Sequence, residues 1–321
     1  MKNLMNTNWF WIVLIGTVGT VLHLTTEFDA TFLFGAIFVW IGTVFYHECG
    51  HWFFAKLRKM NLFMISSFVG MYMNHRWYFI IPTYISFGIC GMYKPLKYGK
   101  MTKADGLWFI SGGMIFNLIA VVVLITIKAI FNIDYSLYNF AILMNALILI
   151  STAIPTKGND GGRVLALLRG NTQELTVFNS MNYLYDPEVK AEEILEDVEI
   201  NHNQDIMAGL ARNIALIEIN SERKEDFKNI YEKEFSDIEK GNEKVAHAFQ
   251  MLYKYADGKE LESSEIEVFN EQESVYIIPF SKIYNFFKSG DKRLLEEFKE
   301  HISYFPSQRE DKVFKRALEE F

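Results

Sequence analysis

His47, Glu48 and His51 form a His-Glu-x-x-His pattern inside a long apolar stretch. If this stretch is helical, residues four apart lie on one face, so both imidazoles can bind one metal ion from adjacent turns. Glu48 then lies beside the metal and can act as general base toward a water molecule there. Ionisable side chains are costly in an apolar segment unless they face a protein interior or cavity. That cost favours a functional site over the alternative of two hydrogen-bonded core histidines.

The composition indicates a membrane protein with a second part in water. Half of the 321 residues are hydrophobic, and Lys and Arg minus Asp and Glu give +7 for residues 1–170 but −14 for residues 171–321. We therefore expect a transmembrane domain at 1–170 and a cytoplasmic helical domain at 171–321. No basic stripe of the kind that binds nucleic acid is present, so nucleic acid is excluded as a partner. The two cysteines, Cys49 and Cys90, imply no disulfide framework.

Four apolar stretches are predicted transmembrane helices, at residues 9–24, 30–57, 107–131 and 135–154. The first could be a signal peptide, but no small-residue cleavage site follows it. From residue 49 to 104 the chain has eight Lys or Arg and no Asp or Glu, which places this connection in the cytoplasm. The second span then runs inward and the fourth returns to the cytoplasm. We expect an integral protein of a bacterial cell membrane, surrounded by lipid bilayer, with cytoplasmic N- and C-termini.

The cytoplasmic connection contains a stretch that is unsuited to a helix. Residues 61–93 are aromatic and β-branched and are interrupted by glycine, asparagine and proline, which favours short strands or a re-entrant hairpin. Non-helical backbone is tolerated at membrane depth where it lines a protein cavity. An edge strand there could receive an extended peptide by β-addition, and an interfacial loop without a substrate role is an equal alternative.

A third candidate ligand comes from counting depth in the membrane. At ~1.5 Å per residue, His47 lies about 25 Å along a span that begins near residue 30, close to the cytoplasmic side of a ~30 Å core. Asp160 follows the fourth span directly and reaches the same side. Zinc held by His47, His51 and Asp160, with a water molecule, would form a catalytic set of three protein ligands. Cys49 as a further ligand is a weaker alternative, since residues two apart on a helix point to different faces.

Asn117 is a lone polar residue in the middle of the third span. An asparagine in a membrane helix needs a hydrogen-bond partner. It could face the active site, or it could form a polar contact between helices, and the residues alone leave both open.

Beyond residue 171 the chain is rich in Glu, Lys, Asp and Asn, with apolar residues at helical spacing. This pattern predicts a soluble, all-α domain, with helix lengths compatible with stacked helical hairpins. It could bind a cytoplasmic protein partner or a substrate tail, cap the membrane site, or only stabilise the protein.

Three motifs together resemble the site-2 protease family of intramembrane zinc metalloproteases. They are His-Glu-x-x-His at 47–51 on one predicted span, Gly-x-x-x-Asn at 113–117 on a later one, and Asp-Gly-Gly-Arg at 160–163 after the last one. Residues 85–94 also resemble the family's glycine-rich membrane-associated β segment. The resemblance covers roughly residues 36–170 and implies zinc ligands at 47, 51 and 160. It further implies Glu48 as the catalytic base and Asn117 near the substrate.

The chain departs from the family pattern at three positions. Met114 and Lys157 stand where prolines are common, and Thr152 stands near the place of the usual asparagine. These changes leave the metal ligands intact and put the positioning of substrate in doubt. The connection at 58–103 is too short for a PDZ domain besides the β segment.

The sequence therefore predicts a mainly α membrane protein with about four transmembrane helices, a short membrane-associated β segment and a C-terminal soluble all-α domain. The expected activity is that of a zinc metalloendopeptidase that cuts a transmembrane or signal-peptide-like segment of a membrane protein or peptide. The alternative is a non-catalytic membrane adaptor, which keeps a structural metal site and acts through its C-terminal domain.

Overall fold

The computed structural model describes residues 8–26, 30–73, 76–79, 88–156, 158–171 and 173–197, with a few positions between 211 and 309. Most of the predicted C-terminal helical domain lies outside the described residues, as does the first part of the glycine-rich stretch at 85–94. The chain divides into two compact units, Met1–Leu175 and Thr176–Phe321. All residues of the site described below belong to the first unit.

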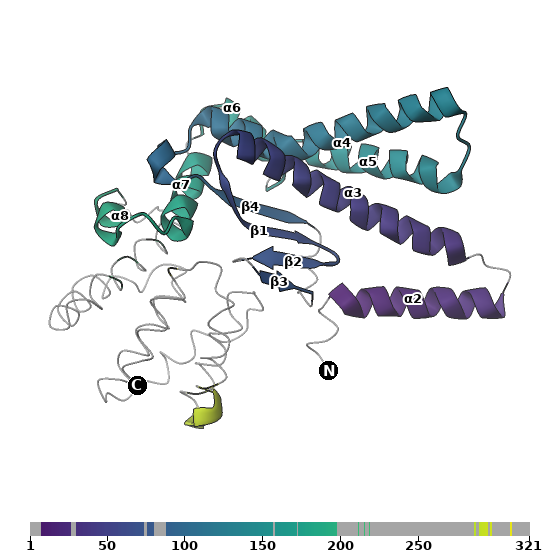
Figure 1. Cartoon of the computed structure of the whole chain (residues 1–321), viewed down its shortest axis with the longest axis horizontal. Helices are drawn as coiled ribbons and strands as arrows, with labels where there is room; N and C mark the ends of the chain where they lie inside the picture. Colours follow the sequence, from purple (N-terminus) through teal and green to yellow (C-terminus); the bar gives the residue numbers. More distant parts are fainter. Residues whose placement is uncertain are drawn as a thin grey trace. The chain divides into compact units, whose positions relative to one another are not determined.

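The first unit is built mainly from helices (Figure 1). Three of them are long and apolar enough to cross a membrane: α3 (Ala30–Leu57), α4 (Lys103–Phe131) and α5 (Ser136–Ala153). Each of the three packs against the other two. The helix that precedes them, α2 (Asn8–Thr25), is also apolar, and its role as a fourth span stays a prediction.

The outward faces of α4 and α5 carry large apolar side chains. Val122, Val123 and Ile130 on α4 are more than 45% exposed, and so are Leu143 and Leu147 on α5. Such continuous apolar exposure is unfavourable in water but matches the hydrocarbon interior of a bilayer. The exposed surface therefore agrees with the membrane-spanning assignment.

Helices α3 and α4 cross with their backbones in contact. A Cβ atom on Gly50 would collide with the backbone of Gly112, and one on Gly112 would collide with the backbone of Gly50. Small residues at a helix crossing allow this close approach, which is the usual way in which membrane helices associate without a hydrophobic driving force. The crossing lies next to His51 and brings α4 against the metal-site segment of α3.

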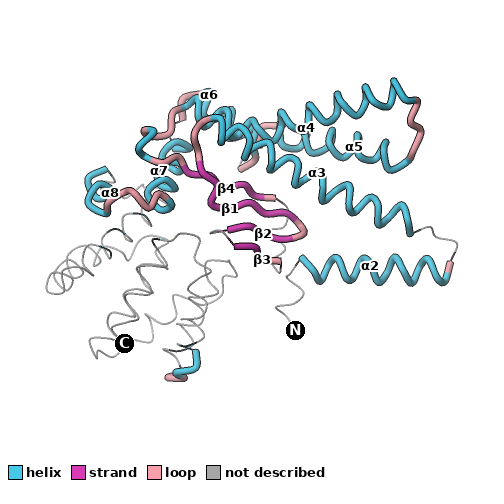
Figure 2. Tube along the Cα trace, viewed as in Figure 1, coloured by secondary structure: helices cyan, strands magenta, loops and turns pink. Residues whose placement is uncertain are grey.

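Four short strands follow α3 and form one antiparallel sheet (Figure 2). They are β1 (Asn61–Ser67), β2 (Gly70–Met73), β3 (Arg76–Tyr78) and β4 (Ile89–Tyr93), in the order β3-β2-β1-β4. The predicted β segment is thus confirmed as a small antiparallel sheet. Among the described strands, β4 pairs with β1 and forms one edge.

A buried cluster of charges joins the end of α3, the end of β4 and the start of α4. Asp105 is 1% exposed and contacts Arg58 Nε at 2.7 Å and Lys94 Nζ at 2.8 Å. Thr102 caps α4 by accepting a hydrogen bond from the Asp105 N–H, and the Asp105 carboxylate accepts one from the Thr102 N–H. The apolar pattern predicts a helix from residue 107, but this capping box lets α4 begin earlier, at Lys103.

Three further helices complete the described chain: α6 (Asp160–Leu168), α7 (Gln173–Tyr185) and α8 (Ala191–Asp197). Of these, α6 packs against α4 and α5. Lys103 Nζ, at the start of α4, donates a hydrogen bond to the Leu168 carbonyl at the end of α6. The contacts of α6 hold its first residue, Asp160, against the transmembrane helices.

Candidate metal centre

Helix α3 presents its two histidines on one face, as the spacing predicts. His47 and His51 are 5% and 6% exposed, and their Nε2 atoms are 3.2 Å apart. Both side chains are therefore inside the protein although α3 is apolar along most of its length.

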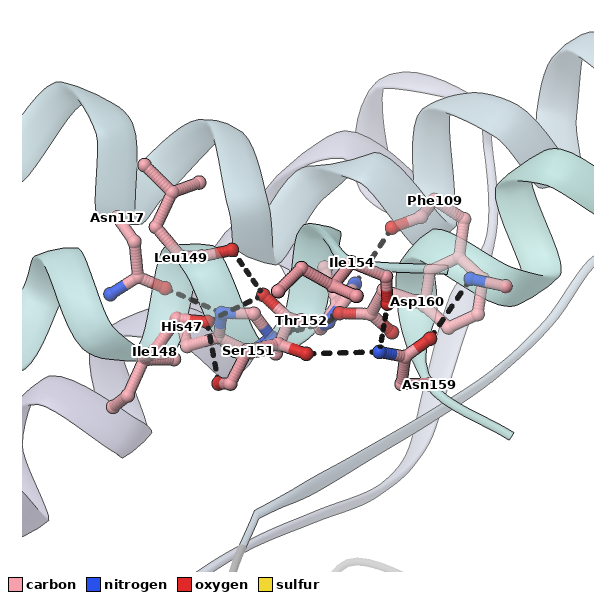
Figure 3. A network of polar contacts seen from close by, with 12 residues as sticks. His47, Phe109, Asn117, Ile148, Leu149, Ser151, Thr152, Ile154, Asn159 and Asp160 are labelled. Carbon is pink, nitrogen blue, oxygen red and sulfur yellow. Dashed lines mark hydrogen bonds and ion pairs between the residues drawn. The ribbon is translucent and has the colours of Figure 1, made fainter. Parts of the chain in front are cut away.

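Asp160 reaches these histidines from the first turn of α6 (Figure 3). Its Oδ2 atom lies 3.1 Å from His47 Nε2 and 3.3 Å from His51 Nε2. Atoms that bind one metal ion at about 2.0 to 2.1 Å with tetrahedral angles are about 3.3 to 3.4 Å apart. The three predicted ligands thus form a nearly equilateral triangle of the size that one metal ion requires, and together they could hold such an ion.

The second nitrogen of each imidazole is also occupied. His51 Nδ1 lies 2.8 Å from the backbone carbonyl oxygen of Phe109, and His47 Nδ1 contacts the side-chain oxygen of Asn117 (Figure 3). A carbonyl oxygen can only accept, so in both contacts the imidazole N–H donates. Each neutral ring then has its lone pair on Nε2, which is the tautomer that binds a metal.

This arrangement brings three hydrogen-bond acceptors together. The two Nε2 lone pairs and the Asp160 carboxylate oxygen point at one another over 3.1 to 3.3 Å. Acceptors at this distance repel one another unless a cation or a proton lies between them. The donor set of two nitrogens and one oxygen therefore fits a metal ion, and it leaves a fourth tetrahedral position open.

The Asp160 carboxyl is held in its charged form. Burial alone would raise the pKa of Asp160, but protons on the imidazole nitrogens of His47 and His51 that face its oxygen outweigh burial and lower the pKa below its ordinary value. In a metal site, the cation takes the place of these protons. A charged carboxylate is the form that binds a metal ion.

Asn159 sets the position of α6, and the sequence reasoning did not identify it. Its side-chain oxygen accepts hydrogen bonds from the N–H groups of Gly162 and Thr156. Its amide nitrogen donates to the carbonyls of Ser151 at 2.9 Å and Ile154 at 2.7 Å (Figure 3). Asn159 thus ties the end of α5 to the start of α6. Its place directly before an acidic helix start was an available signal, because asparagine is a preferred N-cap residue.

The three candidate ligands border a cavity of about 520 Å³. Glu48, 6% exposed, lines the same cavity one residue along α3 from His47. The start of β4 forms another part of the wall, with Gly88, Ile89 and Cys90. The predicted general base and the predicted ligands therefore share one space large enough for part of a peptide.

Gly88 allows the chain to pass directly beside Glu48. Its φ of +102° lies in a region that residues with a side chain rarely adopt, and a Cβ atom there would lie 2.6 Å from Glu48 Oε1. The backbone that leads into the edge strand β4 is therefore in close approach to the carboxylate.

Asn117 lies behind His47 and is not one of the residues that line the cavity. Its side chain is 0% exposed. A direct contact between Asn117 and a substrate stays a prediction. Cys49 lies outside the group of three described residues that could hold a metal ion.

Comparison with protein-family models, with curated proteins and with solved structures found no match to this chain.

Proposed function

We propose that this protein is a zinc-dependent intramembrane endopeptidase, which cuts a transmembrane or signal-peptide-like segment near the cytoplasmic face of the membrane. One observation carries the proposal: a metal-sized triangle of His47, His51 and Asp160 shares a cavity with the carboxylate of Glu48. Two nitrogens, one oxygen and an open fourth position are the ligand pattern of catalytic zinc. The same arrangement in an apolar helix bundle supports a substrate that is itself in the membrane.

Glu48 acts as the general base. Bound zinc would polarise a peptide carbonyl and acidify a water molecule. Glu48 takes the proton of the attacking water and delivers it to the leaving amine, because its carboxylate lines the cavity beside the ligands without belonging to the triangle.

The edge strand β4 binds the substrate in an extended form. A peptide bond in a transmembrane helix must be unwound before it can be cut, and its exposed backbone groups then need hydrogen-bond partners. Among the described strands, β4 lies at the edge of the sheet and offers such partners, and its first residues line the cavity. The close approach of Gly88 to Glu48 would bring the bound backbone near the base.

The test is cleavage of single-span membrane proteins that are co-expressed with the wild type or with Glu48→Gln. We expect a shortened product with the wild type and a rate about 10²- to 10⁴-fold lower with Glu48→Gln, as for loss of a general base. Glu48→Gln should still bind zinc, measured by elemental analysis of the purified protein, because Glu48 is not a ligand. Cys49→Ser is the matched control on the neighbouring position, and it should cut like the wild type.

Two results would decide against the proposal. Equal cleavage by the wild type and Glu48→Gln would show that another protease acts in the cells. Zinc binding by the wild type with no cleavage of any substrate in the panel would favour a non-catalytic adaptor with a structural metal site.

A further inference from the structure

Asn145 is a buried polar residue in the middle of the apolar helix α5. It is 5% exposed, and α5 has the length and composition of a membrane span. A buried amide in such a helix is unfavourable unless its donors and acceptor are paired. Its hydrogen bonds connect all three spanning helices.

The direction of each hydrogen bond is set by backbone carbonyls, which can only accept. Asn145 Nδ2 donates to the Ala141 carbonyl at 2.8 Å and faces Thr43 Oγ1 at 3.5 Å. The Thr43 hydroxyl itself donates to the Val39 carbonyl at 2.8 Å. With its nitrogen engaged in this way, Asn145 can offer only its oxygen toward α4.

That oxygen sets the orientation of Asn117. Asn145 Oδ1 accepts from Asn117 Nδ2 at 2.9 Å. Asn117 must therefore turn its own oxygen toward His47 Nδ1, which is the orientation observed (Figure 3). The His47 proton is thereby held on Nδ1, and the Nε2 lone pair is left toward Asp160 and His51.

We propose that Asn145 is a positioning residue for the metal site, and that it holds His47 in its metal-binding tautomer through Asn117. The inference rests on the metal site of the proposed function. Without Asn145, the Asn117 amide can rotate and present its nitrogen to His47 Nδ1. His47 Nδ1 then accepts a hydrogen bond from the Asn117 amide nitrogen, and the imidazole proton moves to Nε2, where it competes with the metal.

The first measurement is the zinc affinity of the purified full-length protein in detergent, determined by competition with a chromophoric chelator. Residues that orient a metal-binding histidine typically contribute 10- to 100-fold in affinity. We expect Asn145→Leu to weaken zinc binding about tenfold. The matched control is Asn139→Leu, on the same helix as Asn145, which removes the bond of Asn139 to Lys128 on α4 and should leave the affinity unchanged.

A double variant separates orientation from simple packing. In Asn117→Asp both side-chain oxygens accept hydrogen bonds. His47 Nδ1 must therefore donate to them, regardless of which residue stands at position 145. Asn145→Leu should therefore fail to weaken zinc binding in the Asn117→Asp background. The visible absorption of bound Co²⁺ should likewise be altered in Asn145→Leu alone and return toward the wild-type spectrum in the double variant. Restored binding also shows that the leucine at 145 does not prevent folding.

The outcomes distinguish the inference from the proposed function. Zinc affinity unchanged in Asn145→Leu, or weakened equally in both backgrounds, overturns the positioning role and leaves the protease proposal intact. A wild-type protein that binds no zinc overturns both. If Asn145→Leu does not fold, Asn145→Ala takes its place in the same cycle, with the same expected results.

Discussion

Among the described residues, two aspartates stand in the first turn of a helix: Asp105 in α4, which is buried, and Asp160 in α6, which is partly buried. Asp105 contacts two side chains with permanent charge, Arg58 and Lys94. Asp160 instead faces two imidazoles, which need not carry any charge, and it lines a cavity. The same side chain in the first turn of a helix therefore has two different environments.

The difference separates a carboxylate that joins parts of the fold from one that is a candidate metal ligand. The charge of Asp105 is compensated by the protein itself, so that its bonds hold α3, β4 and α4 together. The ion-pair contacts that the structure shows for Asp160 are with the imidazoles of His47 and His51, so a metal ion in the cavity would compensate its charge. Burial and hydrogen bonding are common to both, and the supply of fixed cations separates them.

The largest expected effect is on stability, in Asp105→Asn. This change leaves the buried Lys94 ammonium without its anion, and breaking a buried ion pair costs about 3 to 5 kcal/mol. The free energy of unfolding in mixed micelles should fall by this amount, and zinc affinity of the protein that remains folded should be unchanged. A stable Asp105→Asn protein with weakened zinc binding would show that the two clusters are coupled.

Asp160→Asn should have the converse effect. It removes a charged ligand, so zinc affinity in the chelator competition should fall at least about 100-fold, the upper end of what loss of an orienting residue causes. The free energy of unfolding of the zinc-free protein should fall by less than in Asp105→Asn, since no buried Lys or Arg side chain is known to lose its anion. Strong destabilisation without zinc would contradict the distinction between the two aspartates.

Gly113→Ala should weaken zinc binding by about tenfold through displaced histidines. A Cβ atom at Gly113 would lie 2.6 Å from His51 Nε2 and even closer to His47. Gly42→Ala is the matched control on α3, because nothing lies within 4 Å of a Cβ atom there. The control should keep its zinc affinity and gain up to about 1 kcal/mol of stability from helix propensity.

The smallest effect is expected from Arg58→Ala, at about 1 kcal/mol in the free energy of unfolding. The Arg58 side chain is 39% exposed, so water screens its bond to Asp105, and Lys94 remains as the buried partner. Lys56→Ala, which removes an exposed contact to Asn61 at 3.4 Å, should cost nothing measurable. A loss as large as that in Asp105→Asn would assign the compensating role to Arg58.

Much of the candidate site could be predicted without coordinates. The four-residue spacing of His47 and His51 defines one helical face, and the counting of depth brought Asp160 to the same end of the bundle. The bounds of α3 and α5 also follow closely from the apolar runs, because apolar length is what a membrane span requires.

The partners of these residues could not be predicted. The Phe109 carbonyl that orients His51 is a backbone group, which every residue has, and Asn145 has no fixed spacing from Asn117. The sequence alone left Asn117 open between a substrate contact and a helix contact. Its bonds to His47 and Asn145 depend on how three helices are rotated about their axes.

The sequence by itself determined which side chains can bind a metal and that they stand in apolar helices, because composition and periodicity are local properties. Only the tertiary structure decided that three acceptors meet within 3.3 Å of one another, that Glu48 faces the same cavity, and that Asp105 contacts Arg58 and Lys94 while Asp160 contacts two imidazoles. These are distances between segments far apart in the chain. They are set by the helix crossing at Gly50 and Gly112, which no local pattern specifies, and by the bonds of Asn159 back to the end of α5.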